Sequence, residues 1–205
     1  MHPVICIGDI PPKIAERLMV AGSVAVDTET DGLSWSTDEL RLCQLYTPDT
    51  GSVLIQDATG RPPLLTALIE SQEVRKVFHF APFDLRFLLA RWHILGSNVA
   101  CTKAASKLLA PTAPAVEHSL KALLQAELGV RIDKGAVRTG DWSGVLSDEQ
   151  VKYASADVEH LLDLFDRQTE QLRVRGLLGV YDEICRYMPV AAQLEVRGVP
   201  DPLQY

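Results

Sequence analysis

The segment VAVDTET at residues 24–30 is the strongest indication of the fold, because it joins an apolar run directly to two carboxylates. The apolar residues 24–26 predict a buried strand, and Asp27 and Glu29 close it two residues apart. Side chains at positions i and i+2 of a strand point to the same face, so both carboxylates leave the sheet together. Asp27 alone is also typical of a turn or a helix cap. Two neighbouring like charges, however, need a cation or a basic group nearby to offset their repulsion.

The pattern after this strand changes from hairpins to alternating strands and helices. Three apolar runs separated by turn residues predict a meander of three strands, and short strand and helix patterns alternate after it. This order predicts an α/β layer fold with a mixed five-stranded sheet flanked by helices. The expected strands cover residues 24–27, 40–46, 52–55, 74–78 and 99–101, and helices are expected over residues 62–69 and 82–92.

The C-terminal part is almost entirely helical in pattern from residue 102 onward. Ser147 and Gln150 have the spacing of a capping box, in which each side chain bonds to the other residue's backbone N–H. We expect this box to open one long amphipathic helix over residues 147–172, followed by a last helix over residues 180–195. Tyr153 and Asp157 lie one turn apart on the long helix, so they share a face.

Four acids in this order favour a site for hard divalent cations. Asp84 lies in the first turn of the predicted helix 82–92, where an acid also complements the helix dipole. Asp157 could equally be an exposed acid beside a tyrosine at the rim of the core. The set of Asp27, Glu29, Asp84 and Asp157 has no companion Cys or His, which favours Mg²⁺ or Mn²⁺ over zinc. Two such cations, about 3.5–4 Å apart, stabilise both oxygens of an in-line phosphoryl displacement.

Three segments carry a family resemblance: VAVDTETDGL at residues 24–33, KVFHFAPFDLRFLL at 76–89 and DWSGVLSDEQVKYASADVEHL at 141–161. They resemble the three exonuclease motifs of the DEDD superfamily of 3′-5′ exonucleases, in the ribonuclease D-like branch. The resemblance covers about residues 22–172 and implies a ribonuclease H-like core. It also implies two divalent cations, Mg²⁺ or Mn²⁺, as cofactors.

The resemblance assigns a role to each chemical position. Asp27 would contact both metals, Glu29 and Asp157 would help to hold the metal that activates water, and Asp84 the second metal. Tyr153 would orient the attacking water, which marks the tyrosine subclass. The resemblance also implies substrate contacts for neighbouring motif positions, and Leu33 would be an apolar wedge against the terminal base. These positions are Thr28, Thr30, Leu33, His79 and Phe83. His79 is as readily a hydrogen-bonded histidine at the rim, and Phe83 a core residue.

The charge of the chain is acidic but unevenly spread. It carries 20 Lys+Arg against 27 Asp+Glu, a net charge of −7, which argues against coating duplex DNA through bulk positive charge. Residues 1–102 carry −4, residues 103–138 carry +3 and residues 139–205 carry −6. A basic segment is usually a solvated helical face. Under the resemblance, its side chains would instead meet the phosphates of a chain end: Lys103, Lys107, Lys121, Arg131, Lys134 and Arg138.

The cysteines and the N-terminal sequence indicate a cytoplasmic protein with no membrane partner. Cys6, Cys43, Cys101 and Cys185 lie far apart without C-x-x-C spacing, which is typical of reduced thiols. The first residues lack the features of a signal peptide. The longest uncharged apolar run near them, residues 18–26 interrupted only by small residues, falls short of a membrane span of about 20 residues.

The length favours one catalytic domain. We expect a single 3′-5′ exonuclease domain over residues 1–205, similar in size to the stand-alone nanoRNase C type, which degrades very short RNA and assembles into a ring. A homo-oligomer is therefore one expectation. The expected function is metal-dependent hydrolysis at the 3′ end of single-stranded or very short RNA or DNA, releasing 5′-mononucleotides, with RNA favoured. The alternatives are a proofreading DNA exonuclease acting with a separate polymerase and a non-catalytic nucleic-acid-binding module.

Overall fold

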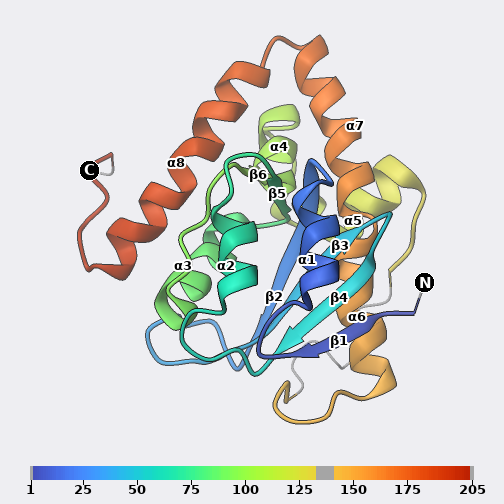
Figure 1. The fold of residues 1–205 in the computed structure, drawn as a ribbon. Coiled ribbons are helices and arrows are strands. Elements are labelled where there is room, and N and C mark those ends of the chain that lie inside the picture. Colours follow the sequence, from blue (N-terminus) through green and yellow to red (C-terminus); the bar gives the residue numbers. More distant parts are fainter. Residues whose placement is uncertain (1, 133–140, 204–205) are drawn as a thin grey trace.

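A mixed sheet of six strands forms the centre of the computed structural model, which describes residues 2–132 and 141–203 (Figure 1). Its strand order is β1-β4-β3-β2-β5-β6. The β2–β3 and β3–β4 pairs are antiparallel, which confirms the predicted meander, whereas β1–β4, β2–β5 and β5–β6 are parallel. The strands are β1 (Val4–Ile7), β2 (Ser23–Thr30), β3 (Leu40–Thr47), β4 (Gly51–Gln56), β5 (Arg75–Phe78) and β6 (Val99–Cys101).

The predicted count of five strands was wrong, because it missed β1 at one edge of the sheet. This strand has only four residues, and three of them are exposed. Its four residues are all apolar, so the sequence lacks the alternation of apolar and polar side chains that indicates a half-buried strand. β1 exists through its parallel pairing with β4, whose partner residues lie about fifty positions further along the chain.

Helices flank the sheet and then extend beyond it. No helix among the described residues is long and apolar enough to cross a membrane. A 3₁₀ turn covers Ala115–His118 and a π-helical turn covers Leu124–Leu128. The α-helices are α1 (Pro12–Met19), α2 (Pro63–Glu70), α3 (Ala81–Trp92), α4 (Thr102–Leu109), α5 (Leu120–Leu123), α6 (Asp148–Glu159), α7 (Leu161–Val174) and α8 (Leu178–Val196).

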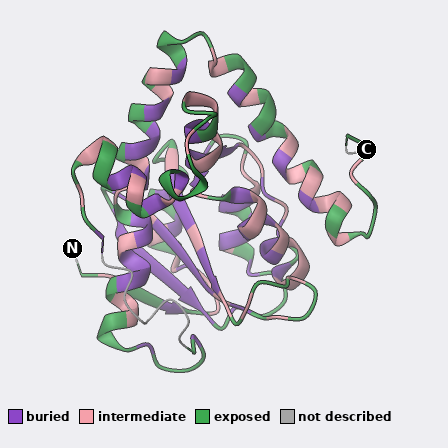
Figure 2. Cartoon of the chain, turned by 180° about the vertical axis from the view of Figure 1, so that it is seen from behind, coloured by how far each residue is buried: buried purple, intermediate pink, exposed green. Residues whose placement is uncertain are grey.

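Both faces of the central strands are covered, and alternate side chains pack on opposite faces. Leu42 of β3 and Leu54 of β4 pack with the ring of Trp142 on the face that α6 covers. The next residues along these strands, Cys43 and Ile55, belong to the larger core on the other face. The central strands are consequently buried along most of their length (Figure 2).

The helix predicted over residues 147–172 is two helices, with a break at His160. Its start is confirmed as a capping box: the Gln150 N–H donates to Ser147 Oγ at 3.2 Å and the Ser147 N–H donates to Gln150 Oε1 at 2.9 Å. The backbone leaves the helical conformation at His160. This residue separates α6, which packs on β2–β4, from α7, which packs on α4 and β5. The apolar stripe runs through both helices, so its period alone did not reveal the break.

Lys76 of β5 is a fully buried lysine beside the end of α2. Its Nζ donates to the Val74 carbonyl at 2.6 Å and also to the Ser71 carbonyl, which lies at the C-terminus of α2. Both partners are neutral, so no carboxylate compensates for the lost hydration of the ammonium. Burial accordingly lowers the pKa of Lys76 to about 8.

The lowered pKa predicts that the free-energy cost of burying Lys76 falls as the pH becomes alkaline. Between the folded and unfolded pKa values the unfolded chain binds more protons, so the free energy of unfolding rises with pH in this window. Relative to Lys76→Met, the wild type should gain about 2 kcal/mol between about pH 7.5 and about pH 9.5. Urea unfolding of both proteins across this range measures the difference. A gap between the two proteins that is constant with pH would contradict the prediction.

Candidate active site

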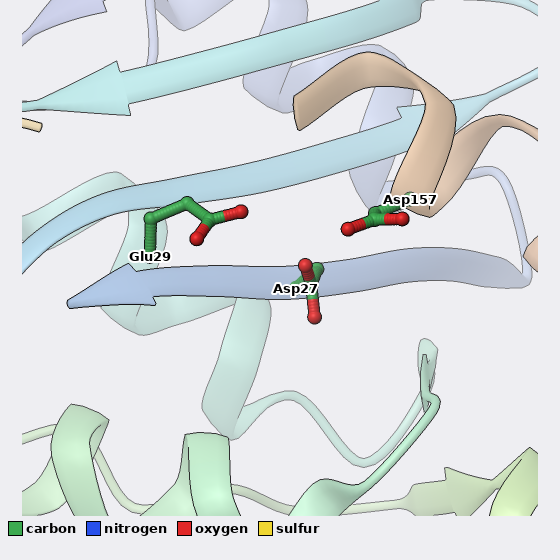
Figure 3. Close-up of side chains that lie close together, drawn as sticks. All are labelled: Asp27, Glu29 and Asp157. Atoms are coloured by element: carbon green, nitrogen blue, oxygen red, sulfur yellow. The ribbon is translucent and has the colours of Figure 1, made fainter. Parts of the chain in front are cut away.

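Three carboxylates meet where α6 packs against β2 (Figure 3). Asp27 and Glu29 leave one face of β2, as their spacing predicts, and Asp157 comes from the last part of α6. One carboxylate oxygen of each residue lies within 4.8 Å of the others. The structure therefore brings together two predicted acids that are neighbours in sequence and a third that follows them by more than one hundred residues.

The surroundings of this acidic cluster suit a cation. Glu29 and Asp157 are buried, and Asp27 is partly exposed. The side-chain amide of Gln44 donates to Glu29 Oε1 at 3.2 Å. An amide donor neutralises no charge, so three carboxylates at this separation repel one another unless a cation lies between them. An oxygen-only ligand set is the one that Mg²⁺ and Mn²⁺ prefer, so the residues present fit such an ion.

Asp84 is not one of these three residues, but a hydrogen bond ties it to the same strand. It occupies the first turn of α3, as predicted, and is only 3% exposed. Thr28 Oγ1 donates to Asp84 Oδ1 at 2.7 Å. Burial raises the pKa of Asp84 to about 7, although the hydrogen bonds from Thr28 oppose the shift. Because Thr28 stands between Asp27 and Glu29 in the chain, Asp84 is tied to the same strand end as the other acids.

Tyr153 lies one turn before Asp157 on α6 and is buried. Burial is the largest cause that raises the pKa of its phenol, and the charges of Asp157, Glu29 and Asp27 raise it further. The phenol therefore keeps its proton and acts as a hydrogen-bond donor. Its ring packs on Trp142, with the two ring centroids 5.9 Å apart. Trp142 itself is buried and packs against this face of the sheet.

The positions expected to contact substrate have different environments. Thr30 Oγ1 donates to the Gly32 carbonyl at 2.5 Å. His79 Nδ1 is 2.9 Å from Thr102 Oγ1, which holds the imidazole ring at the end of β5. Phe83 packs on Phe87 with ring centroids 4.9 Å apart, and it is partly buried against the core. Leu33, in contrast, is 84% exposed.

The basic residues expected to meet phosphates are dispersed. Lys103 Nζ lies 4.6 Å from the centroid of the Phe80 ring. Phe80 is exposed and directly follows His79 in the chain. The guanidinium of Arg131 donates to Gln125 Oε1 at 2.8 Å, and Lys107 and Lys121 are exposed. Lys134 and Arg138 lie outside the described residues.

Gln44 is the site residue that sequence reasoning missed. It stands directly opposite Asp27 in the β2–β3 register and is fully buried. A glutamine inside the apolar strand LRLCQLYT was a signal for a buried polar contact, since buried amides are nearly always hydrogen-bonded. Its partner could not be named without the register between the strands, which fixes which side chains lie opposite each other.

The sequence and the fold are similar to those of known proteins. Ribonuclease D of Zymomonas mobilis is 29% identical over 208 residues, covering 100% of this chain and 50% of that protein. The chain thus spans about half the length of the curated relatives that it matches first. The solved structure of Brucella melitensis NrnC with bound Mg²⁺ superposes with a TM-score of 0.90 at 28% identity and covers 100% of both chains.

A second structure of Brucella melitensis NrnC, bound to pGG, has a TM-score of 0.90 at 29% identity and covers 100% of this chain and 99% of that one. These likenesses confirm the ribonuclease H-like fold. The family model described as 3′-5′ exonuclease matches residues 8–173, a stretch that contains Asp27, Glu29, Asp84, Tyr153 and Asp157. With the whole acidic site inside the matched stretch, the chain belongs to the 3′-5′ exonuclease family.

Proposed function

We propose that this chain is a metal-dependent 3′-5′ exonuclease that hydrolyses the terminal phosphodiester bond of single-stranded or very short RNA. The observation that carries the proposal is the cluster of Asp27, Glu29 and Asp157 beside the protonated phenol of Tyr153. In each cycle, the oxygen of water bonds to the terminal phosphorus and the bond from phosphorus to the upstream 3′ oxygen breaks. That oxygen leaves with a proton, and a 5′-mononucleotide is released.

RNA is the proposed substrate because of the relatives. The curated relatives that match first are named ribonuclease D, and one NrnC structure holds the short nucleotide pGG. These findings favour an exoribonuclease over a proofreading subunit or a non-catalytic module. Short RNA as the substrate and the cytoplasm as the compartment complete the proposal, and assembly into a homo-oligomer stays a prediction.

Two divalent cations, Mg²⁺ or Mn²⁺, are the proposed cofactors. Asp27, Glu29 and Asp157 would hold one ion, and Asp84 with Asp27 would hold the second. When bound, such ions supply a nucleophile at neutral pH and stabilise the charge on the attacking and leaving oxygens. The chain itself gathers the oxygen ligands on one strand and two helices, and the buried Gln44 amide fixes the orientation of Glu29.

Tyr153 is proposed to orient the attacking water rather than to deprotonate it. Its raised pKa leaves the phenol as a donor at any physiological pH, so it is a poor base. The packing of its ring on Trp142 restricts the direction of the hydroxyl. The proposed substrate contacts are the exposed Leu33 against the terminal base, with Thr28, Thr30, His79 and Phe83 around it.

The acidic cluster predicts that divalent cations stabilise the folded protein. With Mn²⁺ at about 100 times its dissociation constant, the wild-type Tm should rise by about 5–10 °C, because the ion binds only the folded site. Asp157→Asn should lose most of this shift. Without metal, it should unfold at or above the wild-type temperature, since one of three repelling charges has gone. Thermal unfolding with and without Mn²⁺ measures both effects.

Glu159→Gln is the matched control for this experiment, because Glu159 is an exposed acid on the same helix. It should respond to Mn²⁺ as the wild type does. A full Mn²⁺ shift in Asp157→Asn would exclude Asp157 as a ligand.

Removal of single site groups should reduce cleavage to different degrees. Asp27→Ala and Asp157→Ala should abolish Mn²⁺-dependent cleavage of a labelled oligonucleotide while the circular dichroism spectrum stays native. Tyr153→Phe should retain more activity, with a loss of about 10²–10³-fold, because it removes one positioned donor and no metal ligand. Undiminished cleavage by either aspartate variant would refute the assignment of the site.

The sugar and length preferences can be measured directly. With matched RNA and DNA substrates of two to about twenty nucleotides, in Mg²⁺ and in Mn²⁺, we expect mononucleotide release to be fastest on the shortest RNAs. A faster rate on long DNA would favour the proofreading role instead.

A further inference from the structure

The loop over residues 31–39 joins β2, the strand that carries Asp27 and Glu29, to β3, and it presents Leu33 to solvent. An apolar side chain that is 84% exposed normally indicates a mobile or unimportant position. Here the loop around it is instead held by hydrogen bonds within itself and to two helices that follow much later in the chain. Ordering a loop costs conformational entropy, so the fixed conformation of this loop indicates that it has a function.

The first set of contacts is inside the loop. Asp38 Oδ2 accepts a hydrogen bond from the Ser34 N–H at 2.8 Å, and the Asp38 N–H donates to the Ser34 carbonyl at 2.8 Å. A Cβ at Gly32 would lie 2.3 Å from Asp38 Oδ2, so a larger residue there would displace the Asp38 carboxylate. Thr30 Oγ1 donates to the Gly32 carbonyl, which joins the loop to the end of β2. Leu33 therefore sits between two fixed residues.

The second set of contacts anchors the loop from outside. The indole N–H of Trp35 donates to Glu195 Oε1 at 3.2 Å, and Arg86 of α3 donates to the same oxygen at 2.7 Å. Arg91 of α3 donates to the Asp38 carbonyl at 2.8 Å. Glu195 belongs to the last turns of α8, which runs beside α3, and the loop lies below both helices (Figure 1).

We propose that Glu195 is a positioning residue for substrate: tied to α3 by Arg86, it holds the 31–39 loop through Trp35, so that Leu33 is positioned against the terminal base. This inference rests on the proposed exonuclease function and deepens it. Glu195 touches neither substrate nor metal ligand. Its effect is therefore on the fraction of protein molecules whose 31–39 loop has the conformation that binds substrate. Apparent affinity falls in proportion to that fraction, whereas the rate of the bound complex does not.

The test separates KM from kcat on an RNA dinucleotide. Glu195→Ala should raise KM by about threefold to tenfold, with kcat unchanged within about twofold. Glu195→Gln retains an acceptor oxygen for both Trp35 and Arg86, so it should restore most of the affinity. Glu183→Ala is the matched control: it removes an exposed acid of α8 whose partner is Arg186 on the same helix, and KM should not change.

A double-mutant cycle with Leu33 decides whether the anchor acts through that side chain. Leu33→Ala should raise KM, and adding Glu195→Ala should then change it little, because the positioned group is already gone. Hydrogen exchange of residues 31–39 should be faster in Glu195→Ala than in Glu183→Ala. Additive effects on KM, or a loss confined to kcat, would overturn the inference while leaving the exonuclease intact. A wild type that cleaves no RNA would refute the proposed function itself.

Discussion

The fold keeps Asp27, Glu29 and Asp157 together against the repulsion among their carboxylates. Three carboxylates within 4.8 Å of one another favour separation of α6 from β2 unless a cation offsets their charge. The folded chain therefore has to hold this contact by packing elsewhere. It does so with a sheet whose central strands are covered on both faces, so that neither β2 nor α6 can move away from the other without exposing apolar surface.

The packing that holds α6 in place also shapes the chemistry. Trp142, Leu42 and Leu54 form a small apolar cluster under α6, and the Tyr153 ring is part of it. Burial in this cluster raises the pKa of the Tyr153 phenol, so one apolar contact both fixes the helix and keeps the hydroxyl protonated. The Gln44 amide provides the hydrogen bond that a buried glutamate needs without neutralising its charge.

Much of the fold and most of the candidate site could be predicted from patterns local to the chain. The spacing of Asp27 and Glu29 on a strand, of Tyr153 and Asp157 on a helix, and the capping box at Ser147 each involve residues at most four positions apart. Edge strand β1, the break at His160 and the Gln44 contact were not predicted. Each of these depends on which element lies beside which, and no local period contains that information.

Side-chain chemistry and backbone periodicity are local properties, so the candidate oxygen ligands and the order of most strands and helices could be predicted from the sequence alone. The tertiary structure placed Asp157 beside Asp27 and Glu29, and it placed Asp84 within hydrogen-bonding distance of Thr28 on the same strand. It also decided that α8 reaches the loop that presents Leu33. These arrangements follow from sheet register and helix packing, in which residues far apart in the chain compete for the same space.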